Sequence, residues 1–151
     1  EDAEERFSKR KIDRSCDVPK GGKPINERIL NPLEIPADVR IYRYAAHTGR
    51  MIVDEDTCPP ELVRKARNTI RELNLNAPRL MRMRREAIMV LEDEIENALA
   101  AGEDMEEFLN VLAESFLLPD DNGNCQAFFS LIRWFLGPAA ENVLSKYGYA
   151  I

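Results

Sequence analysis

The sequence is poor in the residues that most often build metal and catalytic sites. It holds one histidine, His47, and three cysteines, Cys16, Cys58 and Cys125. The cysteines are far apart, odd in number and without a Cys-x-x-Cys spacing, so we expect reduced thiols in a cytoplasm-like compartment. A single disulfide between Cys16 and Cys58 is the alternative. Because no two of these side chains have the short spacing typical of zinc ligands, we predict no metal and no cofactor.

Long apolar runs and enzyme motifs are also missing. The longest apolar run, residues 128–136, is interrupted by Ser130 and Arg133, and a membrane helix needs roughly 20 apolar residues. We therefore predict no transmembrane span. The chain begins without Met, so a removed signal or transit peptide stays open.

No nucleophile elbow, zinc-protease motif, phosphate loop or dinucleotide fingerprint occurs. The stretch DDNGN at residues 120–124 resembles the opening of an EF-hand calcium loop. The twelfth position of that loop would be Leu131, where calcium needs a bidentate Glu. We therefore interpret the stretch as a turn, and we predict that the protein is not an enzyme.

Charge is unevenly distributed along the chain. Residues 1–85 hold 19 Lys+Arg against 14 Asp+Glu, whereas residues 86–151 hold 2 against 13. The balances are +5 and -11. Such asymmetry suggests different partners for the two halves, or head-to-tail association of the chain with itself.

Two basic clusters are the candidate interaction residues. Each suits a nucleic acid or an acidic lipid surface, and the alternative is a solvated helix face that balances the acidic helix beyond it. The first cluster comprises Lys9, Arg10, Lys11 and Arg14, and the second comprises Arg64, Arg67, Arg71, Arg79, Arg82 and Arg85.

The first part of the chain predicts an arm and a hairpin. We expect residues 1–36 to form an extended arm, because prolines and glycines exclude a regular helix over residues 18–36. Apolar residues such as Leu30 and Ile35 nevertheless occur there. We expect this arm to lie across an apolar surface, either of its own domain or of a partner. Residues 39–53 are rich in Val, Ile and Tyr, with a break at residues 47–50, which predicts a β-hairpin.

From Pro59 onward, apolar residues recur at helical spacing. The expected helices are residues 60–74, 78–101, 105–118, 125–136 and 138–147. Asn76 is a plausible cap for the second, and Asp104 with Glu107 forms a capping-box-like pair at the third. The fourth, which contains Trp134, is apolar nearly all round, and we expect the others to pack around it.

The fold class is therefore mainly α: a compact bundle of about five helices with an N-terminal extended arm and a short β-hairpin. The expected domains are residues 1–38 (arm), 39–58 (hairpin) and 59–151 (acidic helical bundle).

One local motif resembles a known family. The amino-terminal EDAEER, through Glu4, Glu5 and Arg6, is similar to the acidic-Glu-Glu-Arg motif of secreted oomycete effectors. That resemblance covers about six residues and implies a small helical effector domain.

We expect a non-enzymatic protein that binds protein partners or assembles into a complex, with self-association included. It would act through the arm and the acidic helical domain. The first alternative is a nucleic-acid-associated regulator, viral or ribonucleoprotein, that uses the Arg-rich helices. The second is a small secreted helical effector.

Overall fold

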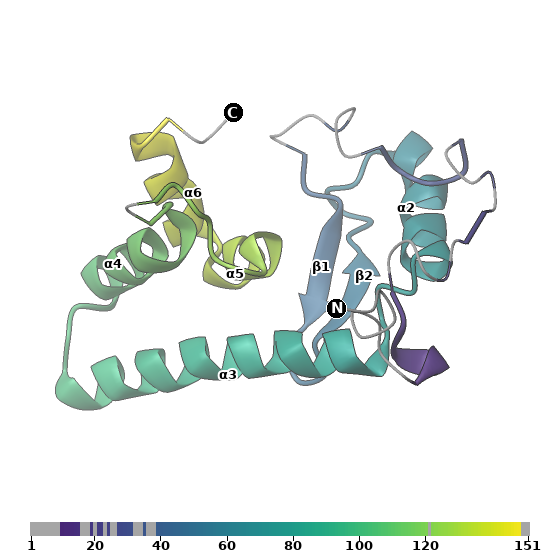
Figure 1. Ribbon diagram of the computed structural model, residues 1–151. Coiled ribbons are helices and arrows are strands. Elements are labelled where there is room, and N and C mark those ends of the chain that lie inside the picture. The colour runs from purple at the N-terminus through teal and green to yellow at the C-terminus, as the bar shows by residue number, and fades with distance from the viewer. Residues whose placement is uncertain are drawn as a thin grey trace. The chain divides into compact units, whose positions relative to one another are not determined.

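The computed structural model describes residues 10–15, 19, 21–22, 24, 27–31, 35, 39–120 and 122–148. Within these residues the fold is mainly α, with five α-helices and one antiparallel two-stranded hairpin (Figure 1). The predicted fold class is confirmed. Lys9 and Cys16 lie outside the described residues. The chain forms two compact units, one up to Met83 and one from Arg84 onward, and the division falls inside a helix.

The first unit contains the hairpin. Strand β1 (Tyr42–Ala45) pairs with β2 (Arg50–Val53), with Ala45 opposite Arg50. The loop therefore consists of residues 46–49, one residue earlier than predicted. Gly49 has a φ of +69°, a left-handed conformation that suits glycine. The amides of Thr48 and Gly49 both donate to the carbonyl of Ala45, at 3.0 and 2.8 Å, and close the turn.

Helix α2 (Pro60–Glu72) packs against this hairpin (Figure 1). Proline at its first position suits a helix start, because the missing amide has no partner there anyway. We predicted that this helix packs against the helix that contains Trp134. Its apolar face instead joins a separate core with the hairpin and Leu30, because a lone hairpin needs such a cover in water. The buried members of this core are Leu30, Ile41, Val53, Cys58 and Ala66.

Arg28, Leu30 and Ile35 of the arm contact their own unit. Leu30 is buried, and its amide donates to Thr69 Oγ1 of α2 at 2.9 Å. Asn68 Nδ2 donates to the carbonyl of Arg28 at 3.1 Å. Ile35 packs against the same core. For these residues, the apolar surface that covers the arm therefore belongs to the chain itself.

Helix α3 (Pro78–Ala101) begins where predicted, but its N-terminal cap is a different residue. The side-chain amide of Asn76 is hydrogen-bonded to the backbone of Met51. Its Oδ1 accepts from the Met51 amide at 2.8 Å, and its Nδ2 donates to the Met51 carbonyl at 2.9 Å. Asp13, in the short 3-10 helix η2 (Lys11–Asp13), instead accepts from the amide of Arg79 at 3.1 Å. A carboxylate there satisfies an amide that has no partner within the helix.

The second unit contains the rest of α3 with α4 (Met105–Leu117), α5 (Phe129–Leu136) and α6 (Pro138–Lys146). Asp104 caps α4 as expected, accepting from the amides of Glu106 and Glu107 at 3.0 Å. The three short helices contact one another (Figure 1). The buried core that they share with α3 consists of Leu91, Leu112, Ala113, Leu117, Ile132, Leu136, Ala140, Val143 and Leu144.

The predicted start of the fourth helix at Cys125 is wrong. Helix α5 begins at Phe129, because Phe128 has a φ of +63° and a left-handed backbone that no α-helix accommodates. Only one side of α5 is fully buried, through Leu131, Ile132 and Leu136, while Trp134 is half-buried. Arg133 links α5 to α6 by a bidentate pair with Glu141, both contacts at 2.8 Å.

Candidate interaction surface

The first basic cluster lies on the junction between α2 and α3. Asn74 Nδ2 donates to the carbonyls of Ile12 and Arg14, at 3.1 and 2.8 Å. Arg10 Nε lies 3.8 Å from Asp13 Oδ2, and Lys11 is exposed. Residues 10–14 are therefore held against their own unit by backbone contacts, while the charged ends of Arg10 and Lys11 face water.

The second cluster is divided between two helices. On α2, Arg64, Arg67 and Arg71 are all exposed and recur at spacings of three and four, so they share one face. Arg67 forms an ion pair with Glu55, and Arg71 Nη2 lies 3.0 Å from Glu72 Oε1. Two of these three guanidinium groups are therefore already neutralised by carboxylates within the chain.

Arg79, Arg82 and Arg85 belong to α3. Arg79 and Arg82 are exposed. Arg85 is half-buried, and its Nη1 donates to Glu92 Oε2 at 2.6 Å. The predicted residues that the structure describes thus come from three segments: residues 10–14, α2 and α3. Residues 10–14 contact the first turn of α3 through Asp13, and the exposed basic groups of α3 lie at that end of the helix.

Sequence reasoning missed the apolar side chains that follow them on α3. Met83, Met89 and Val90 are 36%, 46% and 48% exposed. The apolar stripe in the sequence drew attention to the opposite face, through Ile88 and Leu91, and those two are fully buried. The sequence does indicate these two exposed residues, because Met89 and Val90 fall outside the apolar stripe, at positions where a surface helix usually carries polar residues.

The charge and polarity of the exposed side chains on α3 therefore change along the helix. Its first turn is basic, Met83, Met89 and Val90 follow with the acidic Glu86 among them, and its last turns are acidic; all eight side chains are exposed. We call this set the α3 face; it comprises Arg79, Arg82, Met83, Glu86, Met89, Val90, Asp93 and Glu96.

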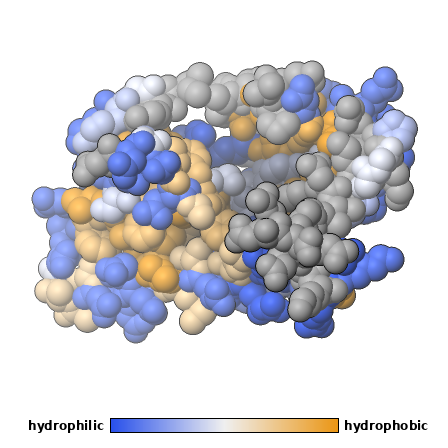
Figure 2. Space-filling view, viewed as in Figure 1, coloured by the Kyte–Doolittle hydropathy of each residue, from blue (hydrophilic) through white to orange (hydrophobic). Residues whose placement is uncertain are grey.

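Other apolar side chains also reach water in the second unit. Figure 2 shows hydrophobic residues, in orange, interspersed with hydrophilic ones over the region of α4, α5 and α6. Leu99 and Val111 are 58% and 55% exposed, and Tyr147 is 45% exposed. Single exposed apolar residues are normal in a folded protein, so they mark a surface only where several lie together.

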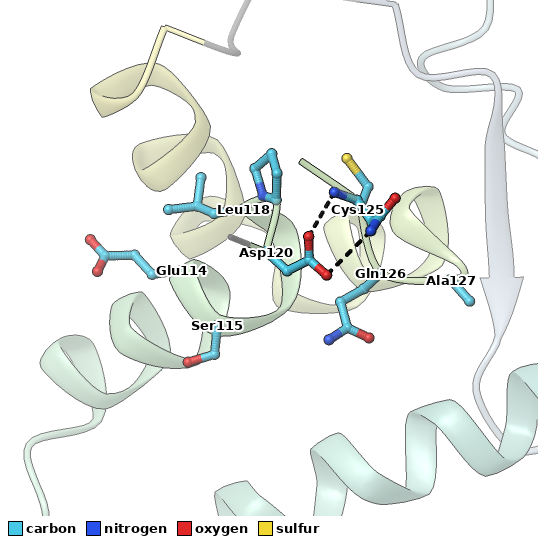
Figure 3. Close-up of a pocket in the computed structure, with 9 residues that line it drawn as sticks. Glu114, Ser115, Leu118, Asp120, Cys125, Gln126 and Ala127 are labelled. Carbon is cyan, nitrogen blue, oxygen red and sulfur yellow. Dashed lines mark hydrogen bonds between the residues drawn. The ribbon is translucent and has the colours of Figure 1, made fainter. Parts of the chain in front are cut away.

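A hollow of about 400 Å³ lies beside the loop between α4 and α5. In Figure 3 the carboxylate of Asp120 points toward the residues that follow it in the loop. It accepts from the amides of Asn122 and Asn124, at 2.9 and 2.8 Å. These contacts, chiefly that with Asn124, lower the pKa of Asp120. Its oxygens thus close a turn, which matches our interpretation of DDNGN.

The perturbed titratable groups are explained by burial or pairing. Burial raises the pKa of Tyr42 to about 12 and also raises the pKa of the Cys58 thiol, which is free. The contact between Lys146 and Glu114, at 2.8 Å, lowers the pKa of Glu114 and raises that of Lys146. Among the residues that the structure describes, no three potential metal ligands gather in one group.

The two compact units differ in net charge. Residues 1–83 hold 17 Lys+Arg against 14 Asp+Glu, and residues 84–151 hold 4 against 13. The balances are +3 and -9, so the asymmetry of the sequence follows the division of the fold. Helix α3 carries that change of sign along a single exposed face.

No protein-family model matches this chain, and no curated protein matches it either. The resemblance at EDAEER falls within residues 1–9, which the structure does not describe. No helix in the described ranges combines the length and apolar character that crossing a bilayer requires.

Proposed function

We propose that this protein is a non-enzymatic interaction protein, a subunit that binds other protein chains through the α3 face and its acidic unit. The observation that carries the proposal is the exposure of Met83, Met89 and Val90 on one side of α3, with charged side chains beside and between them. Apolar groups rimmed by polar residues are typical of protein-binding surfaces. Met is common at such surfaces because its flexible side chain adapts to different partners.

The arm has a smaller part in this proposal than the sequence suggested. Its described residues near Arg28 and Leu30 are bound to α2 of the same unit, through Asn68 and Thr69. A partner that captured this segment would have to replace those hydrogen bonds and the buried contacts of Leu30. We therefore assign partner binding first to the α3 face.

The test is an affinity purification from the native cell with in-cell cross-linking, read by quantitative mass spectrometry. A variant with Met83, Met89 and Val90 replaced by Ser removes the apolar middle and leaves every charge in place. The matched control carries Val111→Ser on α4, where the side chain is somewhat more exposed than those three. We expect proteins, this chain included, that are enriched with the wild type and the control but lost with the triple variant. Identical protein profiles for all three would refute the proposal.

A nucleic-acid-associated regulator is the second candidate, and the exposed row of Arg64, Arg67 and Arg71 favours it. The carboxylates that pair with Arg67 and Arg71 work against it, because phosphate would have to displace them. Binding of labelled RNA and DNA at low salt tests this candidate. It predicts an affinity that falls steeply as salt rises and that weakens when the three arginines become Ala. Absence of binding at low salt would eliminate the candidate.

A further inference from the structure

A second exposed surface forms where residues 10–14 lie against the start of α3. The carboxylate of Asp13 accepts from the amide of Arg79 at 3.1 Å, and Arg10 Nε lies 3.8 Å from the same carboxylate. Figure 1 shows η2, in purple, beside the first turn of α3. Two segments that are far apart in the sequence therefore contribute to one surface, and both lie within the first unit.

This surface combines basic side chains with an exposed apolar one. Ile12 is 58% exposed. Three residues make one turn of a 3-10 helix, so the side chains of Lys11 and Ile12 project to other sides of η2 than that of Asp13, which is directed at α3. We call the exposed set the η2–α3 patch; it comprises Arg10, Lys11, Ile12, Arg79 and Arg82.

The cations of the patch are available to a partner. Among the residues that the structure describes, no carboxylate forms an ion pair with Lys11, Arg79 or Arg82. Asp13 is buried against α3 and presents little of its charge to water. Glu86, one turn beyond Arg82, is the next carboxylate along α3 and limits the patch on that side. The patch is thus a cationic surface with an apolar side chain among its charges.

We propose that the η2–α3 patch binds an acidic protein segment that carries an apolar side chain between its carboxylates. The inference rests on the proposed function, because it gives the chemistry of one protein partner. The apolar side chain of that segment would cover Ile12, and its carboxylates would pair with the surrounding guanidinium and ammonium groups. Complementary charges favour association with the correct partner, and burial of the apolar contact adds affinity.

The composition of the patch and the net charge of the chain favour a short protein segment over other polyanions. Proteins that bind single-stranded nucleic acid stack its bases on aromatic side chains, and the patch contains none. The whole chain has a net charge of -6, so an extended polyanion or an anionic membrane would also meet repulsion. Exposed charges act over about 8 Å at physiological salt. A short segment on the patch therefore meets mainly the local cations.

Titration of the full chain with a synthetic peptide, followed by two-dimensional NMR of the backbone amides, tests the proposal. The probe is a short peptide of Glu and Asp with one central Leu, and the control probe has Ser in place of that Leu. We expect the amide signals of residues 10–14 and 79–82 to shift, with an affinity several-fold higher for the Leu peptide. Ile12→Ser should make the affinities for the two peptides equal.

Charge reversal locates the binding site. Lys11→Glu and Arg79→Glu should each weaken binding of the Leu peptide about tenfold. The control Arg64→Glu makes a matching change at an exposed position of α2. Arg64 lies eight residues before Glu72 at the end of that helix, about 12 Å along its axis, so this change should affect the affinity little. Unchanged circular dichroism shows that each variant is folded.

Four results would overturn the proposal. The first three are no binding of the Leu peptide at low salt, equal affinities of the wild type for the two peptides, and equal losses for Lys11→Glu and Arg64→Glu. The fourth is tighter binding of single-stranded DNA of equal charge, or of vesicles that contain phosphatidylserine, which would assign the patch to that class of partner instead.

This inference and the proposed function fail separately, because the triple Ser variant of Met83, Met89 and Val90 leaves every residue of the η2–α3 patch in place. If the acidic peptide does not bind but the triple variant still loses captured proteins, only the present inference is removed. If the peptide binds as expected but the triple variant changes no captured protein, the assignment of partner binding to the α3 face is wrong and the η2–α3 patch stands.

Discussion

Asp13 offers the sharpest test of how the two ends of the first unit are joined. Asp13 is 7% exposed, and its carboxylate accepts from the amide of Arg79 in the first turn of α3, 66 residues further along the chain. Replacing it with Ala removes a helix cap, which costs about 0.5–2 kcal/mol, and a favourable charge at a helix N-terminus, worth about 0.3–1 kcal/mol. We expect the free energy of unfolding to fall by about 2 kcal/mol.

Urea unfolding followed by far-ultraviolet circular dichroism measures this loss. Asp13→Asn keeps an oxygen acceptor and loses the charge, so it should cost about half as much as Asp13→Ala. Asp56→Ala is the matched control, because that carboxylate is exposed, and it should change stability by less than about 0.5 kcal/mol. Equal stabilities for Asp13→Ala and the control would refute the assignment of Asp13 as the cap of α3.

A double-mutant cycle extends the same test. Asn74 holds the carbonyls of Ile12 and Arg14 on either side of Asp13. Because both side chains fix the same short segment, the effects of Asp13→Ala and Asn74→Ala should not add. We expect a coupling of about 1 kcal/mol between them. Strict additivity would show that Asn74 and Asp13 act independently.

Three further predictions concern other parts of the fold. Burial raises the pKa of Tyr42 from its ordinary 10.0 to about 12, so the neutral phenol stabilises the folded state below pH 10 and that stabilisation is lost as pH rises toward 12. Tyr42→Phe should flatten the fall in stability across this range by about 2 kcal/mol in alkaline denaturation, and an unchanged slope would contradict the burial argument. Arg133→Met leaves the partly buried Glu141 without its bidentate partner, so we expect a loss of about 1–3 kcal/mol in denaturant unfolding followed by Trp134 fluorescence; no loss would show that water replaces the pair. Gly102 has a φ of +73° after the end of α3, and a Cβ there would meet open space. Gly102→Ala should therefore cost about 1 kcal/mol in thermal unfolding through backbone strain alone, and a neutral result would contradict the left-handed conformation.

The sequence predicted the helices well where local signals agree. Pro60 and Pro78 open α2 and α3, and Asp104 caps α4, because a proline or a cap acts within its own turn. The start of α5 failed for a complementary reason. The apolar run of the sequence already includes Phe128, and the backbone angle of that residue delays the start of the helix to Phe129. Periodicity carries no information about such an angle.

Local sequence patterns did not predict which residues contact one another across the fold. Asn is a common residue type at helix caps, but the side-chain amide of Asn76 forms hydrogen bonds with the backbone amide and carbonyl of Met51 instead. The pairing of α2 with the hairpin likewise depends on which apolar faces meet in space. On the candidate surface, the amino-acid composition of the helices predicted the arginines. It did not predict the exposure of Met83, Met89 and Val90, because an apolar residue on a helix is usually assigned to the core.

Cross-linking from residue 89 tests the central claim most directly. Met89→Cys, in a chain with Cys16 and Cys125 replaced by Ser, is labelled with a photoactivatable maleimide and irradiated in an extract of the native cell. Val111→Cys in the same background is the comparison, because Val111 is also exposed. We expect protein adducts formed through residue 89 that are absent or much weaker for residue 111. Equal adducts at both positions, or none through residue 89, would contradict an α3 face that binds protein partners.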